Sequence, residues 1–136
     1  MRVLVDTSAW VDFFNGHPSP EADTLARLID EEVDLLTCGV IAAEVLQGLK
    51  RTKTLRAIEG HFLEMDWLTP REPETYVQTA NLYRELRSLG VTIRSTIDCL
   101  IARLAHEHKV LLLSKDRDIR LIIESGVLEV KALPVV

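Results

Sequence analysis

Four carboxylates stand where this chain should be apolar. Asp6 and Asp116 each follow a short apolar run, and Glu44 and Asp98 each interrupt one. A carboxylate beside a hydrophobic core is destabilising unless it is paired, protonated or bound to a metal. The neighbouring sequence offers no dedicated Arg or Lys partner for each of the four. We therefore expect one shared cause, a metal site built from carboxylate oxygens.

The pattern of apolar residues predicts the elements that would position these acids. Residues 2–6 and 110–113 are continuous apolar runs, typical of strands buried on both faces of a parallel sheet, and 34–37 and 128–133 are weaker candidates. Helices are predicted near residue 8 and over 20–29, 40–50, 54–65, 73–89 and 95–108. This alternation indicates a three-layer α/β/α sandwich with a mainly parallel central sheet.

In such sheets ligands bind beyond the carboxyl ends of the strands, where the strand order reverses. Asp6 and Asp116 lie at or just past predicted strand ends. Glu44 and Asp98 lie early in helices that would pack against the same edge. We expect the four acids to converge there.

Each acid also has a simpler interpretation. Asp6 could cap a helix that starts near residue 8, and Asp98 could complete a capping box with Ser95. Glu44 could be a half-exposed helical residue, and Asp116 a turn residue. The order strand end, helix, helix, strand end favours a shared site over four independent roles.

Length and composition limit the class of protein. We expect one domain spanning residues 1–136, with a substantial hydrophobic core. No apolar run approaches the ~20 residues that a membrane helix needs, and Asp6 cuts the apolar N-terminus too short for a signal peptide. Cys38 and Cys99 suggest buried thiols rather than a disulfide framework, and the four histidines form no zinc motif. A cytoplasmic protein is expected.

The net charge of −5 argues at first against a nucleic-acid partner. The four carboxylates account for −4 of it, which leaves −1 for the rest of the chain. The charge therefore permits binding to a phosphate backbone once metal neutralises the acids. Only 5% of residues are aromatic, so recognition should rest on phosphates more than on base stacking. Three basic clusters are candidates for that contact: Lys50, Arg51, Lys53 and Arg56; Arg84, Arg87 and Arg94; Lys115, Arg117 and Arg120.

Four segments, in order and across nearly the whole chain, carry a family resemblance. They are VDTSAW at 5–10, AEVLQG at 43–48, the segment 90–102 that ends in DCLIA, and LSKDRD at 113–118. Together they resemble PIN-domain ribonucleases, in particular the VapC toxins of bacterial and archaeal toxin–antitoxin pairs. Two positions depart from the family pattern: Ser114 stands where Thr is frequent, and Ile119 where an aromatic residue often follows.

The resemblance implies a metal-dependent endoribonuclease that uses Mg²⁺, with Mn²⁺ as a substitute. It implies that Asp6, Glu44 and Asp98 hold a first ion and that Asp116, helped by Asp118, completes or positions a second. The residues implied to support the site or contact substrate are Thr7, Ser8, Ser114 and Arg117. Thr7 and Ser8 could equally serve the helix that follows them.

The resemblance also implies partners: an RNA such as a tRNA, a cognate antitoxin and a second copy of the chain. Apolar positions that could supply the homodimer surface are Leu55, Ile58, Phe62, Leu63, Leu82 and Leu86. Two alternatives stay open. A haloacid-dehalogenase-like phosphatase also begins with a strand-end Asp but needs a second Asp two residues on, where this chain has Ser8. A PIN-like module that binds RNA or protein without cutting would usually have lost some of the acids.

Overall fold

The structure, a computed structural model, describes residues 1–49 and 53–135. Within these ranges four parallel strands form one sheet in the order β3-β2-β1-β4. The strands are β1 (Arg2–Val5), β2 (Asp34–Thr37), β3 (Asp66–Trp67) and β4 (Leu111–Leu113). The chain moves outward from β1 to β3 and then returns to place β4 on the other side of β1. The strand order therefore reverses between β1 and β4, which is where such sheets place ligands.

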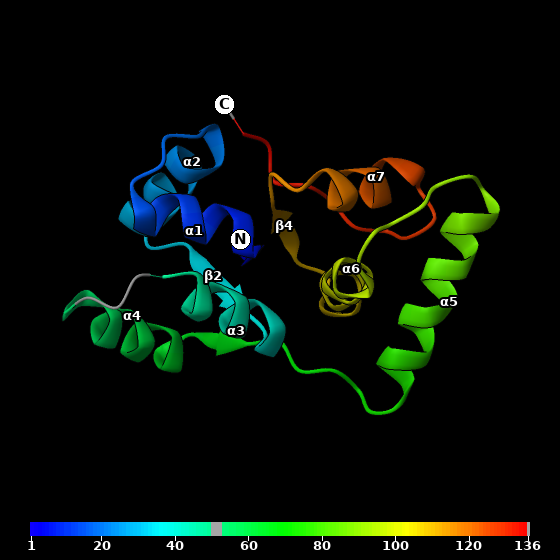
Figure 1. Cartoon of the computed structure of the whole chain (residues 1–136), viewed down its shortest axis with the longest axis horizontal. Coiled ribbons are helices and arrows are strands. Elements are labelled where there is room, and N and C mark those ends of the chain that lie inside the picture. The colour runs from blue at the N-terminus through cyan, green and yellow to red at the C-terminus, as the bar shows by residue number, and fades with distance from the viewer. Residues whose placement is uncertain (50–52, 136) are drawn as a thin grey trace.

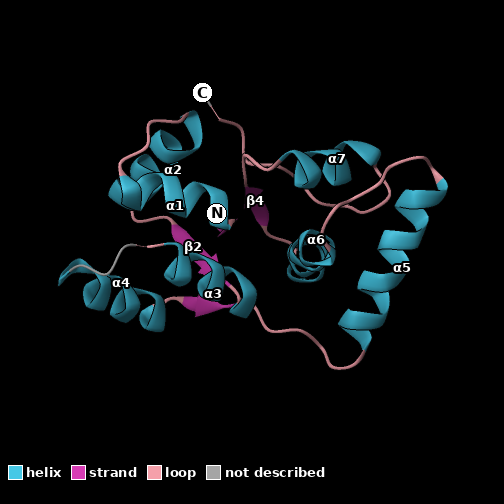
Figure 2. Ribbon diagram, viewed as in Figure 1, coloured by secondary structure: helices cyan, strands magenta, loops and turns pink. Residues whose placement is uncertain are grey.

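Seven helices lie within the described residues, and they cover both faces of the sheet. They are α1 (Thr7–Asn15), α2 (Pro20–Asp30), α3 (Gly39–Gly48), α4 (Lys53–Glu64), α5 (Glu74–Ser88), α6 (Thr96–His108) and α7 (Arg117–Ser125). Helices α1 and α2 lie on one side of the strands, and α5 and α6 lie on the other (Figure 1). Figure 2 shows the strands as a narrow layer between these helices. The predicted three-layer α/β/α fold is confirmed.

The central strand explains why the fold is layered. Val3, Leu4 and Val5 of β1 are fully buried, because helices cover both of its faces. Trp10 of α1 is also fully buried and packs its ring edge-on to Phe62 of α4, with ring centroids 5.1 Å apart. This contact packs α1 against α4 directly after β1 ends.

Helix boundaries follow the expected local chemistry. The Ser19 hydroxyl accepts a hydrogen bond from the Ala22 amide at 3.0 Å, and Pro20 begins α2. Gly90 adopts a φ of 82° and ends α5, with its amide donating to the Arg87 carbonyl at 3.0 Å. The predicted start of α2 and the predicted stop at Gly90 are both confirmed.

The C-terminal region differs from the prediction. No helix is predicted after residue 108, and a turn at Asp116 is an alternative interpretation, whereas α7 begins at Arg117 and buries Ile119 and Ile122. The segment 128–133 is not a strand. It forms one isolated bridge, in which Leu112 donates its amide to the Lys131 carbonyl at 3.0 Å.

Two further differences are small. Strand β3 is absent from the prediction, because its two residues are exposed and too few to show a periodic pattern. Helix α3 ends at Gly48, and residue 50 of the predicted helix 40–50 lies outside the described residues. Cys38 and Cys99 are buried free thiols, as expected. None of the helices in the described ranges combines the length and apolarity needed to cross a bilayer.

Candidate metal centre

The acids singled out in the sequence gather at the carboxyl end of the sheet. Asp6 follows β1, and its amide donates to the Leu113 carbonyl of β4 at 2.9 Å, which joins the two strand ends. Asp116 precedes α7, which begins four residues beyond β4. Glu44 lies on α3, and Asp98 lies in the first turn of α6. The predicted convergence on the β1–β4 switch point is therefore confirmed in its geometry.

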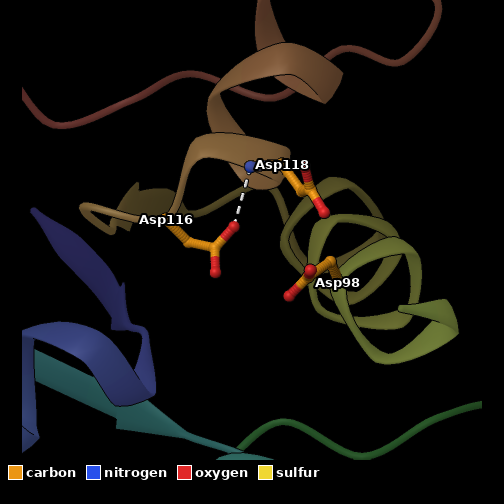
Figure 3. A group of neighbouring side chains, drawn as sticks. All are labelled: Asp98, Asp116 and Asp118. Carbon is orange, nitrogen blue, oxygen red and sulfur yellow. Dashed lines mark hydrogen bonds between the residues drawn. The ribbon is translucent and has the colours of Figure 1, made fainter. Parts of the chain in front are cut away.

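Three carboxylates form the tightest group among the described residues. One oxygen from each of Asp98, Asp116 and Asp118 lies within 4.8 Å of the others. Figure 3 shows the three side chains pointing toward a common space, Asp98 from α6 and the other two from the start of α7. The expected first set of Asp6, Glu44 and Asp98 shares only Asp98 with this trio.

Hydroxyl groups hold the other two acids. The Asp6 Oδ2 atom accepts hydrogen bonds from the Ser114 hydroxyl at 2.8 Å and the Ser8 hydroxyl at 3.1 Å. The Glu44 Oε1 atom accepts one from the Thr7 hydroxyl at 2.9 Å. Ser114 also accepts from the Asp116 amide at 3.0 Å, so one hydroxyl connects two of the acids.

The hydrogen bonds share a pattern that bears on chemistry. Asp6 and Glu44 use one carboxylate oxygen each, as just described. Asp116 uses Oδ1, which accepts from the Asp118 amide at 2.7 Å, and Asp118 uses Oδ2 for its bonds from Arg94. The second oxygen of Glu44, Asp116 and Asp118 has no hydrogen-bond donor among the described residues, and neither does either oxygen of Asp98. The Thr7 amide adds a further hydrogen bond to the Asp6 carboxylate. Glu44, Asp116 and Asp118 are thus each held by one oxygen while the other stays available to a ligand, and both oxygens of Asp98 stay available.

Electrostatics in the cluster are unfavourable without a cation. Burial, followed by the negative charges of Asp116 and Asp6, raises the pKa of Asp98 from its ordinary 3.8 to about 7. Burial also raises the pKa of Asp6, although the hydrogen bonds from Ser114 and Ser8 oppose it. No ion pair reaches Asp6, Glu44, Asp98 or Asp116 within the part of the chain that the structure describes.

The simpler interpretations fare differently. Asp6 occupies the position before α1, but its side chain makes no capping hydrogen bond. Ser95 caps α6 by accepting from the Ile97 amide at 3.2 Å, and no hydrogen bond joins the Asp98 carboxylate to Ser95 among the described contacts. Asp116 does cap a helix, since it accepts from two amides of α7. Asp116 therefore combines a capping role with a place in the cluster.

Two ion pairs near the cluster could not be predicted from the sequence, although both basic residues belong to the basic clusters considered for RNA contact. The Arg94 amide and Nε both donate to Asp118 Oδ2, at 3.1 and 3.2 Å. Burial would raise the pKa of Asp118, but these bonds outweigh it and hold that pKa below its ordinary value. Lys115 lies beside Asp116 in the sequence, yet its Nζ reaches Asp12 Oδ2 at 2.6 Å. Arg117, predicted to contact substrate, is exposed at the start of α7.

The donor set fits a divalent cation. Every available ligand atom is a carboxylate oxygen, the type that Mg²⁺ and Mn²⁺ prefer. The spacing within the trio allows one ion to approach all three side chains. Burial and the negative charges of the neighbouring acids raise the pKa of Asp98, and a bound cation would offset the repulsion between these charges.

A cavity lies away from the acidic cluster. It measures about 830 Å³ and opens at the other end of the sheet, beside Arg2 and Leu111, where β1 and β4 begin. Arg103, which lines the same cavity, is ion-paired with Glu107 at 2.6 Å. None of the five clustered acids lines this cavity, so its size does not identify the functional site.

Comparison with known proteins gives the family. A family model of the PIN domain matches residues 3–123. The chain is 35% identical over 117 residues to the VapC ribonuclease Mb1587 of Mycobacterium bovis and to Ribonuclease VapC11 of Mycobacterium tuberculosis. Each alignment covers 85% of this chain and 87% of the relative. The phosphatase alternative does not fit this match, and Ser8 stands where that class needs its second Asp.

Solved structures share the fold at lower identity. VapBC-1 from nontypeable Haemophilus influenzae superposes with a TM-score of 0.68 at 18% identity, covering 98% of this chain and 97% of that chain. VapBC2 from Rickettsia felis, bound to a promoter DNA fragment, gives 0.66 at 21% identity over 90% and 94%. VapC20 of Mycobacterium tuberculosis, described as a toxin that cleaves the sarcin–ricin loop, gives 0.63 at 17% over 95% and 98%. With the PIN match over most of its length, this chain belongs to the PIN-domain family and is similar in sequence to its VapC ribonucleases.

Proposed function

We propose that this chain is a divalent-metal-dependent endoribonuclease and the toxin of a type II toxin–antitoxin pair in the cytoplasm. The observation that carries the proposal is the acidic cluster, in which Glu44, Asp98, Asp116 and Asp118 each keep an oxygen without a donor among the described residues. The similarity to VapC ribonucleases supports RNA as the substrate.

The metal would be held by the trio Asp98, Asp116 and Asp118, with Asp6 and Glu44 as further ligands. Mg²⁺ is the expected ion, and Mn²⁺ suits the same oxygen donors. When bound, it would lower the pKa of a water and neutralise charge on the phosphodiester.

The chain's own residues keep the acids in place for this role. Ser114 donates to Asp6 and accepts from the Asp116 amide, so the ends of β1 and β4 hold a fixed relation. Ser8 donates to the same oxygen of Asp6 and accepts from the Lys115 amide at 3.2 Å. Thr7 restrains Glu44. These hydroxyls would spare the acids part of the reorganisation that ligand binding otherwise requires.

An antitoxin and a structured RNA such as a tRNA are the proposed partners. The solved relatives include toxin–antitoxin complexes from Rickettsia felis and Haemophilus influenzae, which supports the first. An antitoxin segment with a basic side chain would complement the unpaired acids of the cluster.

A homodimer remains a proposal, on a smaller surface than expected. Phe62, Leu82 and Leu86 are buried in the chain's own core, so the part of the dimer prediction that used them is wrong. Leu63 at the end of α4 is 78% exposed and Trp67 of β3 is 41% exposed. These two residues offer an apolar surface to a second copy, and light scattering on Leu63→Glu beside the wild type tests it. A monomeric wild type at high concentration would contradict the dimer.

The enzymatic proposal is tested by cleavage of a mixed tRNA preparation with protein purified free of antitoxin. EDTA should abolish cleavage, and excess Mg²⁺ should restore it. Glu44→Gln removes one cluster charge with little change of shape and should abolish cleavage. Glu124→Gln makes the same change at an exposed position of α7 and should leave cleavage intact.

The outcomes separate the alternatives. Cleavage that survives rigorous chelation would exclude the metal mechanism. Binding of RNA without cleavage, in both Mg²⁺ and Mn²⁺, would favour the PIN-like module that binds without cutting.

A further inference from the structure

Arg94 is placed at the edge of the acidic cluster by two hydrogen bonds to one oxygen. Its amide and its Nε both donate to Asp118 Oδ2, at 3.1 and 3.2 Å. The Asp118 side chain is only 6% exposed, whereas the Arg94 side chain is 78% exposed. The buried carboxylate therefore serves as an anchor, and the guanidinium it holds faces solvent.

This anchoring leaves most of the guanidinium available. An arginine has five N–H donors in a planar fork, and the bond to Asp118 uses the one on Nε. The two terminal nitrogens make no hydrogen bond to the described residues. Their paired N–H groups match two oxygens of a phosphate, and the fixed Nε limits the rotamer entropy lost on binding.

The negative charge at the site means that a free cationic group beside it would favour RNA binding. Five carboxylates at one sheet edge repel an RNA backbone even when a divalent ion offsets part of their charge. Lys115 is next to Asp116 in the sequence, but its ammonium is paired with Asp12, 2.6 Å from the Asp12 Oδ2 atom. Arg94, by contrast, is held by an acid of the cluster itself. Its hydrogen bond to Asp118 raises the pKa of its guanidinium, and the negative charges of Asp116 and Asp98 add to that rise.

We propose that Arg94 binds a phosphate of the RNA next to the acidic cluster, with Asp118 orienting its guanidinium. This inference rests on the proposed ribonuclease function and adds a substrate-binding residue to it. The competing explanation is structural: Arg94 would only tie the loop before α6 to α7. The two explanations differ in their dependence on salt, because only a phosphate contact releases counterions from RNA.

The test compares Arg94→Gln, Arg94→Lys and the control Lys131→Gln. Lys131 is an exposed cation that lines the cavity at the far end of the strands, and its change removes the same charge. Binding of a fluorescein-labelled 12-nucleotide oligouridine is followed by anisotropy in Ca²⁺ between 50 and 300 mM KCl, with a gel to check that the probe stays intact. One phosphate contact contributes about 0.7 to the slope of log K against log salt for single strands.

Arg94→Gln should reduce that slope by about 0.7 and weaken binding about tenfold at low salt. It should raise the KM for tRNA cleavage more than it lowers kcat. Arg94→Lys should keep the slope, since its charge remains, and Lys131→Gln should match the wild type. An unchanged slope in Arg94→Gln, with a fall in melting temperature or kcat alone, would overturn the inference and leave Arg94 a structural residue.

Two provisions keep the result interpretable. Arg94→Gln removes the guanidinium that pairs with the buried Asp118 carboxylate. If this variant fails to fold, the slope is measured in the double variant Arg94→Gln, Asp118→Asn and compared with the slope of Asp118→Asn alone. The same loss of about 0.7 is expected there, and equal slopes would overturn the inference. A wild type that cuts no RNA in Mg²⁺ or Mn²⁺ contradicts the proposed function, whereas a wild type that cuts RNA with the slope unaltered by Arg94→Gln contradicts only the role of Arg94.

Discussion

Asp98→Asn tests whether Asp98 belongs to a charged site that needs a cation. Burial and the charges of Asp116 and Asp6 raise the pKa of Asp98 to about 7 in the folded, metal-free protein. In the unfolded chain the same group ionises near its ordinary 3.8. Between these values the folded state binds a proton that the unfolded state has lost. The associated stability is therefore complete below the unfolded pKa and is lost as pH rises through about 7.

The magnitude follows from the two pKa values. A difference of about three corresponds to ~4 kcal/mol at high pH, and this is a ceiling because Asp98 is only partly buried and its neighbours titrate with it. Losing an acid from the first turn of α6 works the other way by ~0.3–1 kcal/mol. We expect metal-free Asp98→Asn to be more stable than the wild type by ~1–2 kcal/mol near pH 8.5, about 3–8 °C in Tm. Near pH 5.5 the folded Asp98 carboxyl is neutral but the unfolded one is already ionised, so the difference should be about half as large, and it should vanish only below the unfolded pKa of 3.8.

The assay measures thermal unfolding in EDTA at both pH values and RNA cleavage in Mg²⁺ on the same preparations. Asp98→Asn should cut no RNA, and Mg²⁺ should raise its Tm less than that of the wild type. Asp30→Asn, at an exposed position of α2, removes the same charge far from the cluster and should show neither effect. A variant that melts lower than the wild type at both pH values and still cuts RNA would refute the reasoning. It would also remove Asp98 from the site.

Two further predictions concern Lys115 and Ser114, which lie next to the acidic cluster in the sequence. Lys115→Met should lower the free energy of unfolding in urea by ~1–2 kcal/mol, because it leaves the buried Asp12 carboxylate without its cation. An unchanged midpoint of the urea transition would contradict a stabilising ion pair between Lys115 and Asp12. Ser114→Ala should lower the free energy of unfolding by ~1 kcal/mol and weaken Mg²⁺ binding measured by calorimetry, because Asp6 loses a hydrogen-bond donor and the Asp116 amide loses its acceptor. Ser114→Thr keeps the hydroxyl and should therefore keep both the stability and the Mg²⁺ affinity of the wild type. Equal Mg²⁺ affinity in Ser114→Ala would show that the hydroxyl does not organise the site.

The strand ends were the most predictable part of the site. Asp6 and Asp116 follow apolar runs whose carboxyl ends must meet in a parallel sheet, so the sequence alone places them together. Helix α7 escaped prediction because Asp116 and Asp118 look like turn residues, although Ile119 and Ile122 have helical spacing and Gly126 ends the helix at a φ of 71°. Residues 128–133 look like a strand but make one bridge, since pairing depends on tertiary contacts as well as on apolar content.

The pair of Arg94 and Asp118 could not be predicted, because a loop brings together residues 24 positions apart and no periodic pattern marks that contact. The choice among the acids was also beyond the sequence. The trio of Asp98, Asp116 and Asp118 depends on how α6 and α7 pack, whereas the family resemblance implies Asp6, Glu44 and Asp98 as the first set.

The hydrogen bond from Ser114 to Asp6 joins residues 108 positions apart, and this separation matters while the protein is being made. Asp6 and Glu44 leave the ribosome before β4 and α7, which follow α6 in the chain. Until these two elements emerge, the nascent chain lacks Ser114, Asp116 and Asp118, and so lacks most of the cluster. On the proposed function, an unfinished chain would be harmless to the RNAs of the ribosome that is translating it. Cleavage of RNA would begin only after α7 has emerged and folded, so an antitoxin would have to be present by then.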